Sequence, residues 1–293
     1  MPLRHARMSR HHAGAEAVTQ RAGLAIQHVA LTGSTNSDLL ARARAASQAG
    51  EAFSACVLVA GRQTAGRGRH GRAWHGAEGA SLTFSVAWPL AADLDLSGLS
   101  LAVGVALAEA LAPVVDVVAG PARSIGIKWP NDLWLMDEGR FESESGPDDA
   151  APHGRKLAGV LIEAAPCGDG RIAVIGVGLN VAEQAVSDAA SGVAWLREID
   201  ASATPASALD ALLPVLVAAL QSFERHGFAA FAERFAARDV LRGQRLRAGE
   251  LEGIADGVSA SGELWLRTAG GAVTVRSGEV RLQRLGLAAA LPC

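Results

Sequence analysis

Cysteine is scarce in this chain, and its distribution excludes two kinds of structural site. Only three cysteines occur among 293 residues, and Cys56, Cys167 and Cys293 lie far apart in the sequence. An odd number at wide spacing fits neither a disulfide framework nor a zinc site. We therefore expect a reducing, cytoplasmic setting.

Long apolar runs are also missing. No segment approaches the roughly 20 apolar residues that a membrane helix needs. The longest apolar stretch, residues 209–220, contains Asp210 and is interpreted as a helix packed in a core. We therefore expect no membrane partner.

The first 25 residues contain almost no acid. Four arginines are accompanied by one acidic residue, Glu16, and the apolar centre of a secretory signal is absent. We predict a disordered tail over residues 1–25. An organelle transit peptide and a start at Met8 remain open alternatives.

Positive charge is not in excess either. The formal net charge is −3, so no global field attracts nucleic acid and any basic site must be local. The sequence has no Ser-His-Asp arrangement with its local signatures and no His/Cys cluster with metal spacing. Hydrophobic residues make up 49% of the chain, which is enough for a sizeable core.

Strand patterns predominate early in the chain and helix patterns come late, which favours an α+β fold with helices on one side of a sheet. We expect the helix at 99–111 to end at Pro113. We expect residues 133–136 to resume the strand that meets Pro130, and the acidic residues 137–154 to form a mobile surface loop. Other expected strands lie at 56–60, 81–88, 157–164 and 171–177, and other helices lie between Ser34 and Gly50, at 206–223 and at 228–237.

The pattern of residues in the sequence changes after residue 241. Glycines punctuate short alternating stretches such as 263–268 and 272–276. This pattern is typical of a small all-β barrel of short strands. We therefore predict one large domain over residues 26–240 and a small barrel over residues 241–286.

The most informative segment is Gly-Arg-Gly-Arg-His-Gly-Arg at residues 66–72, which we call the arginine loop. Its glycines allow close backbone approach to a ligand, and its arginines suit phosphate oxygens because the guanidinium donates two parallel hydrogen bonds. The spacing matches neither a Walker loop nor a dinucleotide fingerprint. An arginine-glycine RNA-binding tract and a solvated loop are the alternatives.

Three further segments carry polar residues at the ends of predicted strands. In Lys128-Trp129-Pro130-Asn131-Asp132, the Asn and Asp oxygens suit a ribose or Mg²⁺, and Lys128 suits a phosphate, although a simple turn has the same sequence. Lys156 begins an apolar strand, a position that also protects strand edges from aggregation. The segment 176–181 ends a strand with two glycines and an amide, which indicates either a ligand or an ordinary β-bulge.

Together these segments resemble the biotin–protein ligases over residues 29–285, with a further match at residues 33–36. The resemblance implies a core like that of class II aminoacyl-tRNA synthetases, followed by an SH3-like barrel. It implies ATP, biotin and Mg²⁺ as small molecules, and a biotin carboxyl carrier protein with an acceptor lysine as partner. A homodimer and the identity of the acceptor are left open.

The resemblance also assigns residues. It implies catalytic roles for Lys156, Arg67 and Arg69. Biotin binding is implied for Ser34, Thr35, Asn36, Gln63, Arg67, Gly68, Arg69, Lys156 and Gly159. ATP binding is implied for Arg69, Arg72, Trp74, Asn131, Asp132, Lys156 and Asn180, with Asp132 also at the metal.

The chain departs from the family pattern in three places. His70 stands where many members have arginine, and the acidic insertion between Leu135 and Arg155 is long for its position. About 28 residues precede Val29, too few for the DNA-binding domain of repressor members, so we expect no DNA binding. Rival interpretations are a lipoate or octanoate attachment enzyme, a nucleic-acid-binding protein and a non-catalytic biotin sensor.

Overall fold

The computed structural model of the protein describes residues 17–21, 23–118, 123–137, 154–184, 192–278 and 280–282. Eight strands form the larger sheet, in the order β1-β2-β3-β4-β8-β7-β6-β5. Their bounds are β1 Ala17–Arg21, β2 Leu24–Thr32, β3 Cys56–Gln63, β4 Ser81–Ala91, β5 Arg123–Lys128, β6 Asp132–Asp137, β7 Gly154–Cys167 and β8 Gly170–Asn180. Only β2 and β3 pair in parallel, so the sheet is mixed and the α+β prediction is confirmed.

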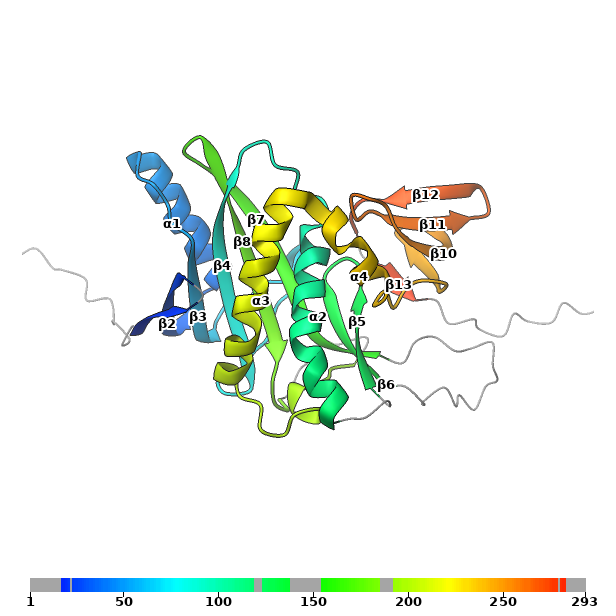
Figure 1. Cartoon of the computed structure of the whole chain (residues 1–293), viewed down its shortest axis with the longest axis horizontal. Coiled ribbons are helices and arrows are strands. Elements are labelled where there is room, and N and C mark those ends of the chain that lie inside the picture. The colour runs from blue at the N-terminus through cyan, green and yellow to red at the C-terminus, as the bar shows by residue number, and fades with distance from the viewer. Residues whose placement is uncertain are drawn as a thin grey trace, which may run out of the picture.

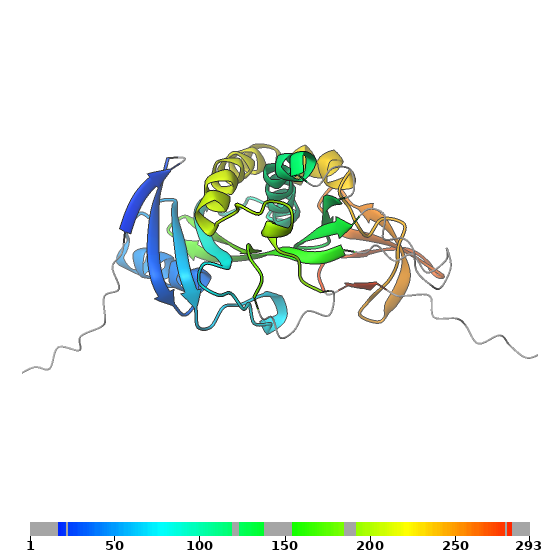
Figure 2. The same ribbon diagram turned by 90° about the horizontal axis from the view of Figure 1, so that it is seen from below.

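Helices cover both faces of this sheet, which corrects the expectation of helices on one side (Figures 1 and 2). On one face lie α2 (Leu99–Val118) and α3 (Pro205–His226), followed by the short 3-10 helix η5 (Gly227–Phe231) and the short α-helix α4 (Ala232–Ala236). On the other lies α1 (Thr35–Ala49), which packs on β3, β4, β7 and β8 over a separate apolar cluster. The order of strands and helices along the chain does not indicate which face of the sheet each helix covers, so the sequence could not predict this arrangement.

Strand β8 shows how one strand serves both faces. Its residues 173, 175, 177 and 179 belong to the large core under α2 and α3. Residues 172 and 174 face the α1 cluster, and Gly176, Gly178 and Asn180 continue on that side because side chains alternate along a strand. The α1 face therefore changes from apolar to polar toward the end of β8, where a ligand can approach.

Helix α3 contains the stretch that the sequence interpretation assigned to a core helix, and that prediction is confirmed. The span Pro205–Ala236 has the length and hydropathy of a membrane span. However, its apolar stripe, which includes Leu209, Leu213 and Leu216, is buried against the rest of the core. Burial of this stripe accounts for the apolar composition.

The C-terminal strands form a second, five-stranded antiparallel sheet in the order β12-β11-β10-β9-β13. The strands are β9 Arg245–Ala248, β10 Leu251–Val258, β11 Leu264–Thr268, β12 Gly271–Val275 and β13 Val280–Leu282. Leu246 and Leu264 belong to the same apolar cluster as α2 and α3, and the Trp129 indole donates to the Gly262 carbonyl oxygen at 2.9 Å. The small sheet is therefore packed against the larger unit.

Three local expectations were wrong. Helix α2 runs through Pro113 to Val118. A proline inside a helix removes one hydrogen bond and crowds the preceding turn, but the helix retains its packing on β5 and α3. Strand β6 does not resume β5: the chain reverses at the cis Trp129–Pro130 bond and β6 pairs antiparallel with β5. Ordered structure begins with β1, before residue 26. The predicted loop at 137–154 lies largely outside the described residues.

Candidate functional site

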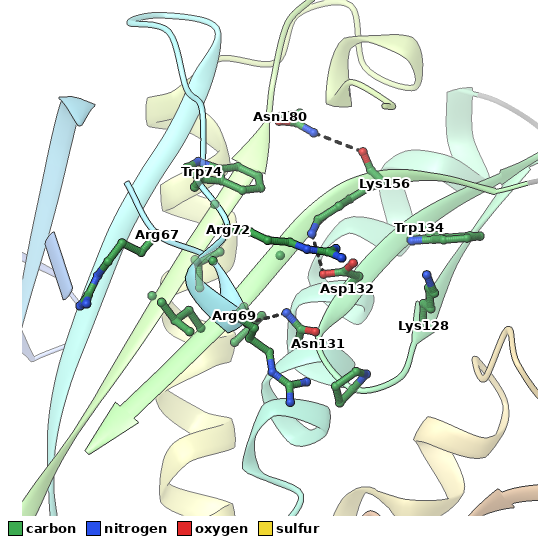
Figure 3. A pocket seen from close by; sticks show the side chains of 18 of the residues that line it. Arg67, Arg69, Arg72, Trp74, Lys128, Asn131, Asp132, Trp134, Lys156 and Asn180 are labelled. Carbon is green, nitrogen blue, oxygen red and sulfur yellow. Dashed lines mark hydrogen bonds and ion pairs between the residues drawn. The ribbon is translucent and has the colours of Figure 1, made fainter. Parts of the chain in front are cut away.

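A cavity of about 980 Å³ opens on the α1 side of the larger sheet. Every residue that the sequence assigned to a site lines this cavity, although these residues come from six separate segments (Figure 3). They are Ser34, Thr35, Asn36, Gln63, Arg67, Gly68, Arg69, Arg72, Trp74, Asn131, Asp132, Lys156, Gly159 and Asn180. The small sheet contributes Val280, Arg281 and Leu282 to the same lining.

The start of α1 forms one wall of the cavity. Ser34 caps the helix in an extended conformation, and Gly50 ends it in the left-handed region with φ 69°, as the sequence predicted. The Thr35 backbone N–H donates to Gln63 Oε1 at 2.7 Å. An orphan donor of the helix N-terminus is thereby satisfied, and Gln63 is held against the helix.

The arginine loop closes on itself as a short hairpin. Gly68 N–H donates to the Arg72 carbonyl oxygen at 2.7 Å, and Trp74 N–H donates to the Gly66 carbonyl oxygen at 2.9 Å. A methyl group on Gly66 would lie 2.5 Å from the Trp74 carbonyl oxygen, so the close approach requires glycine. His70, with φ 55°, and Gly71, with φ 73°, make the tip of the turn.

Trp74 fastens the end of this loop to the sheet. A Cβ atom on Gly178 would come within 2.3 Å of the Trp74 indole, so the missing side chain makes the space for the ring. Gly176 makes space for Asn36 in the same way, with 2.4 Å from a built Cβ to Asn36 Oδ1. The pairing of β8 runs without a register shift here, so these glycines admit neighbouring side chains and the β-bulge alternative is wrong.

The three loop arginines point in different directions (Figure 3). Arg67 turns away from Lys156 and pairs with Glu163, with 3.1 Å from its terminal nitrogen to each carboxylate oxygen. Arg72 points toward Asp132 and Lys156. Burial lowers the pKa of the Arg69 guanidinium, and the negative charge of Asp132 acts in the opposite direction. Arg67 is thus engaged by Glu163, whereas Arg72 extends on the Lys156 side of the loop (Figure 3).

A β-bulge directs Lys156 into the cavity. Leu133 pairs with Ala158 while Trp134 pairs with Lys156, so Leu157 is an extra residue on β7. Both Leu157 and Ala158 are buried in the core under the helices. In a regular strand Lys156 would lie on the opposite face from Gly159, and the extra residue returns it to the same face.

The lysine is held at its backbone and paired at its tip. Its N–H donates to the Gly192 carbonyl oxygen at 3.2 Å, and its carbonyl oxygen accepts from Ala194 N–H at 2.9 Å. Lys156 Nζ lies 2.7 Å from Asp132 Oδ1 and 5.9 Å from the centre of the Trp74 ring. The ammonium group therefore has a defined position and a carboxylate partner.

The two amide residues predicted to bind ATP, Asn131 and Asn180, make contacts with backbone carbonyl oxygens in this structure. Asn180 Nδ2 donates to the Lys156 carbonyl oxygen at 3.2 Å, and Asn131 Nδ2 donates to the Val160 carbonyl oxygen at 2.9 Å. Both amides therefore support the strands that carry Lys156 and Asp132, and each still lines the cavity.

Sequence reasoning missed several residues at the site. Glu163 pairs with Arg67 and accepts from Asn36 Nδ2 at 3.0 Å. Ser85 is fully buried against Thr35, and Trp134 also lines the cavity, with the centre of its ring 4.7 Å from the ammonium of Lys128. One signal was available: Ser81, Thr83 and Ser85 alternate with apolar residues along β4, which indicates a polar face.

Ion pairs brace the start of β7 next to Lys156. Arg155 donates to both carboxylate oxygens of Glu198, at 2.9 and 2.7 Å, and lies 3.6 Å from Asp137. Burial alone would raise the pKa of Glu198, but hydrogen bonds from Arg155 and Trp195 and the nearby positive charges bring it below its ordinary value. The Glu198 hydrogen bond raises the pKa of Arg155.

Comparison with known proteins gives a consistent result. Residues 41–180 match the biotin/lipoate A/B protein ligase family. The chain is 34% identical over 261 residues to the biotin–[acetyl-CoA-carboxylase] ligase of Mycobacterium tuberculosis, covering 86% of each protein. It is 33% identical over 261 residues to the bifunctional ligase/repressor BirA of Escherichia coli, covering 84% of this chain and 72% of that protein.

A similar result comes from solved structures. The fold resembles that of the biotin protein ligase from Aquifex aeolicus in complex with biotin and ATP, with a TM-score of 0.67 and 25% identity. This similarity covers 88% of the present chain and 98% of the Aquifex chain. It therefore extends over both sheets.

Proposed function

The chain belongs to the biotin/lipoate A/B protein ligase family, and from this premise we propose that it is an ATP-dependent biotin–protein ligase. It activates biotin with ATP to biotinyl-5′-AMP, releases pyrophosphate, and transfers biotin to a lysine of a biotin carboxyl carrier protein. The observation that carries this proposal is the single cavity. It gathers every residue that the family resemblance assigned, from segments as far apart as Ser34 and Asn180.

The first step joins two anions. The carboxylate oxygen of biotin attacks the α-phosphorus of ATP, and the bond from phosphorus to the bridging oxygen breaks to release pyrophosphate. Lys156, Arg69 and Arg72 supply positive charge where negative charge grows in the transition state. We assign Arg67, together with Ser34, Thr35, Asn36, Gln63, Gly68 and Gly159, to the biotin side of the cavity.

The second step consumes the mixed anhydride. The amine of the acceptor lysine attacks the acyl carbon, AMP leaves, and the amine gives up a proton. Before that step, water must be kept from the anhydride, and the arginine loop beside Trp74 is the segment placed to cover it. Opening of the loop then admits the acceptor lysine.

The residues present are compatible with Mg²⁺. Asp132 offers one carboxylate, and no group of three or more His, Cys, Asp or Glu converges among the residues that the structure describes. Mg²⁺ is usually held by one or two carboxylates, water and substrate phosphates. When bound at Asp132, the ion would neutralise charge on the phosphate oxygens.

The finer parts of the architecture are also proposals. We propose a class II synthetase-like core over residues 26–240 and an SH3-like barrel over residues 241–286. The mixed sheet and the five-stranded antiparallel sheet support this division. A cytoplasmic location, a homodimer and the lack of DNA binding stay predictions.

Biotin-dependent exchange of labelled pyrophosphate into ATP tests the function. We expect purified protein to catalyse exchange that rises with biotin and saturates, and to show no exchange with lipoate. Exchange that needs no biotin, or that lipoate supports equally well, would contradict the proposal. A second arm follows labelled biotin into a purified carrier domain and into a variant that lacks the acceptor lysine.

A further inference from the structure

A chain of buried polar side chains lies behind the wall formed by the start of α1. Thr35, Asn36 and Ser85 are 2%, 3% and 0% exposed. Thr35 and Asn36 line the cavity, whereas Ser85 lies behind them on β4. Buried polar groups need hydrogen-bond partners, so the direction of each hydrogen bond in this chain can be worked out from its ends.

The orientation of the Asn36 amide is determined first. Its Nδ2 lies 3.3 Å from the Leu161 carbonyl oxygen and 3.0 Å from Glu163 Oε2. A carbonyl and a carboxylate oxygen accept hydrogen bonds, so the amide must present its NH₂ group to them. The Asn36 Oδ1 atom therefore faces Ser85 Oγ, at 2.6 Å.

The orientation of the Asn36 amide determines, in turn, which acceptor each hydroxyl group donates to. A serine hydroxyl has one proton, and Ser85 must donate it to Asn36 Oδ1 because that atom only accepts. The Thr35 hydroxyl has two acceptors within reach, Ser85 Oγ at 2.6 Å and Gln63 Oε1 at 3.1 Å. Since the Ser85 proton is already in use and two hydroxyl oxygens at 2.6 Å need a proton between them, the Thr35 hydroxyl donates to Ser85.

The Thr35 hydroxyl consequently offers only lone pairs to the cavity. Beside it, Gln63 Oε1 accepts the Thr35 backbone N–H at 2.7 Å, so the Gln63 NH₂ group lies on the other side of the amide. That side is next to Gly66, because a Cβ there would meet Gln63 Nε2 at 2.8 Å. The wall thus pairs an acceptor with a donor, which suits a ligand head with an N–H group beside a carbonyl.

We propose that Ser85 is a positioning residue for substrate specificity, which makes Thr35 an acceptor toward the cavity and so selects a ureido-type head. This inference rests on the proposed function, in which the ligand is biotin. Ser85 does not line the cavity, so it acts through Thr35 and Asn36.

The test is a double-mutant cycle in the full chain, with KM for biotin and for ATP measured by pyrophosphate exchange. Ser85→Ala and Thr35→Val should each raise KM for biotin roughly tenfold, the size of one lost hydrogen bond. The double variant should also show about tenfold and not about a hundredfold, because Ser85 acts through the Thr35 hydroxyl. KM for ATP and kcat should stay within about twofold.

The matched control is Ser81→Ala on the same strand. Ser81 is 5% exposed, and its Oγ accepts from Gln184 Nε2 at 2.6 Å, outside the cavity lining. This variant loses a buried hydrogen bond without touching the chain behind α1. We expect its KM for biotin to match that of the unmodified protein.

If Ser85→Ala fails to fold, Ser85→Cys keeps the shape of the side chain with a somewhat larger atom and retains a weak S–H donor, and should raise KM for biotin by a few fold. Independent, multiplying effects of the two substitutions would overturn the inference. So would a Ser85→Ala effect equal to that of Ser81→Ala, or an equal rise in KM for ATP. Absence of biotin-dependent exchange in the unmodified protein would instead overturn the proposed function.

Discussion

Lys156 and the arginine loop bring positive charge to the same cavity from two kinds of backbone. The Lys156 main chain is held by Gly192, Ala194 and Asn180 through three hydrogen bonds. The loop bonds mainly to itself, and Trp74 and the Arg67–Glu163 pair connect it to the sheet. The strand therefore sets the position of one charge, whereas the positions of the other charges are set mainly by contacts within the loop.

The ion pairs at the site fit this difference. The Arg67 side chain is 45% exposed, and an exposed pair contributes only about 0–1 kcal/mol. Under the proposed function, Arg67 can therefore leave Glu163 for an anionic group of the ligand at a small cost in free energy. Under the same proposal, Lys156 exchanges Asp132 for a phosphate of the nucleotide without moving its backbone.

The largest effect on catalysis is expected from removing the ammonium group of Lys156 on β7. Lys156→Ala should reduce the rate of adenylate formation roughly 10²–10³-fold, because one contact to the developing charge is lost. Pyrophosphate exchange at saturating biotin measures this. Near-normal exchange by the variant would show that the loop arginines suffice alone.

A smaller effect on catalysis is expected from disturbing the hairpin of the arginine loop. Gly66→Ala places a methyl group 2.5 Å from the Trp74 carbonyl oxygen, so the hairpin must open or shift. We expect kcat/KM for adenylation to fall roughly 10–100-fold, as misplaced groups at an active site do.

The control for this change is Gly270→Ala in the small sheet, where a methyl group would meet only Thr268 Oγ1 at 3.8 Å. It should leave kcat/KM unchanged. Equal activity of the Gly66 and Gly270 variants would mean that the hairpin does not determine catalysis.

The contribution of the Arg155–Glu198 ion pair, next to Lys156, to the free energy of unfolding is expected to depend on pH. In the folded protein the pKa of Glu198 lies below 4.5, its ordinary value, so its carboxylate stabilises the fold above that pH. This contribution is lost as the pH falls through the folded-state pKa. Glu198→Gln should lower the unfolding free energy by about 1 kcal/mol near pH 7 and by less in acid.

Thermal unfolding at several pH values checks this prediction. The melting temperatures of the unmodified protein and the Glu198→Gln variant should converge as the pH falls toward acid. A constant difference at all pH values would show that the Arg155–Glu198 pair acts through shape and not through charge.

The smallest effect is expected far from the site. Arg276 pairs with Glu263 at 2.8 Å, but its side chain is 84% exposed. Arg276→Ala should change the unfolding free energy by less than about 0.5 kcal/mol and leave exchange unaffected. A loss of biotin transfer with normal exchange would point instead to a role for this sheet in acceptor binding.

Local signals explain what the sequence could predict. Ser34 and Gly50 bound α1 correctly because helix caps are read from neighbouring residues. The turn that the sequence left open as an alternative is present at Pro130 and Asn131, but Asp132 already begins β6. The motif residues line one cavity, whereas their assignment to biotin and ATP stays a prediction.

Contacts between distant residues explain what it could not. Ser85 meets Asn36 across 49 positions, and Asn36 meets Glu163 across 127. No local pattern encodes such partners. The bulge at Leu157 was equally invisible, because strand alternation assigns Lys156 to the wrong face until the pairing with β6 is known.

The most direct measurement is a crystal structure of the protein with biotinyl-5′-AMP. The account predicts Lys156 Nζ within hydrogen-bonding distance of the phosphate, with the arginine loop folded over the ligand. A ligand bound elsewhere, with Lys156 still on Asp132 and the loop arginines turned to solvent, would contradict it.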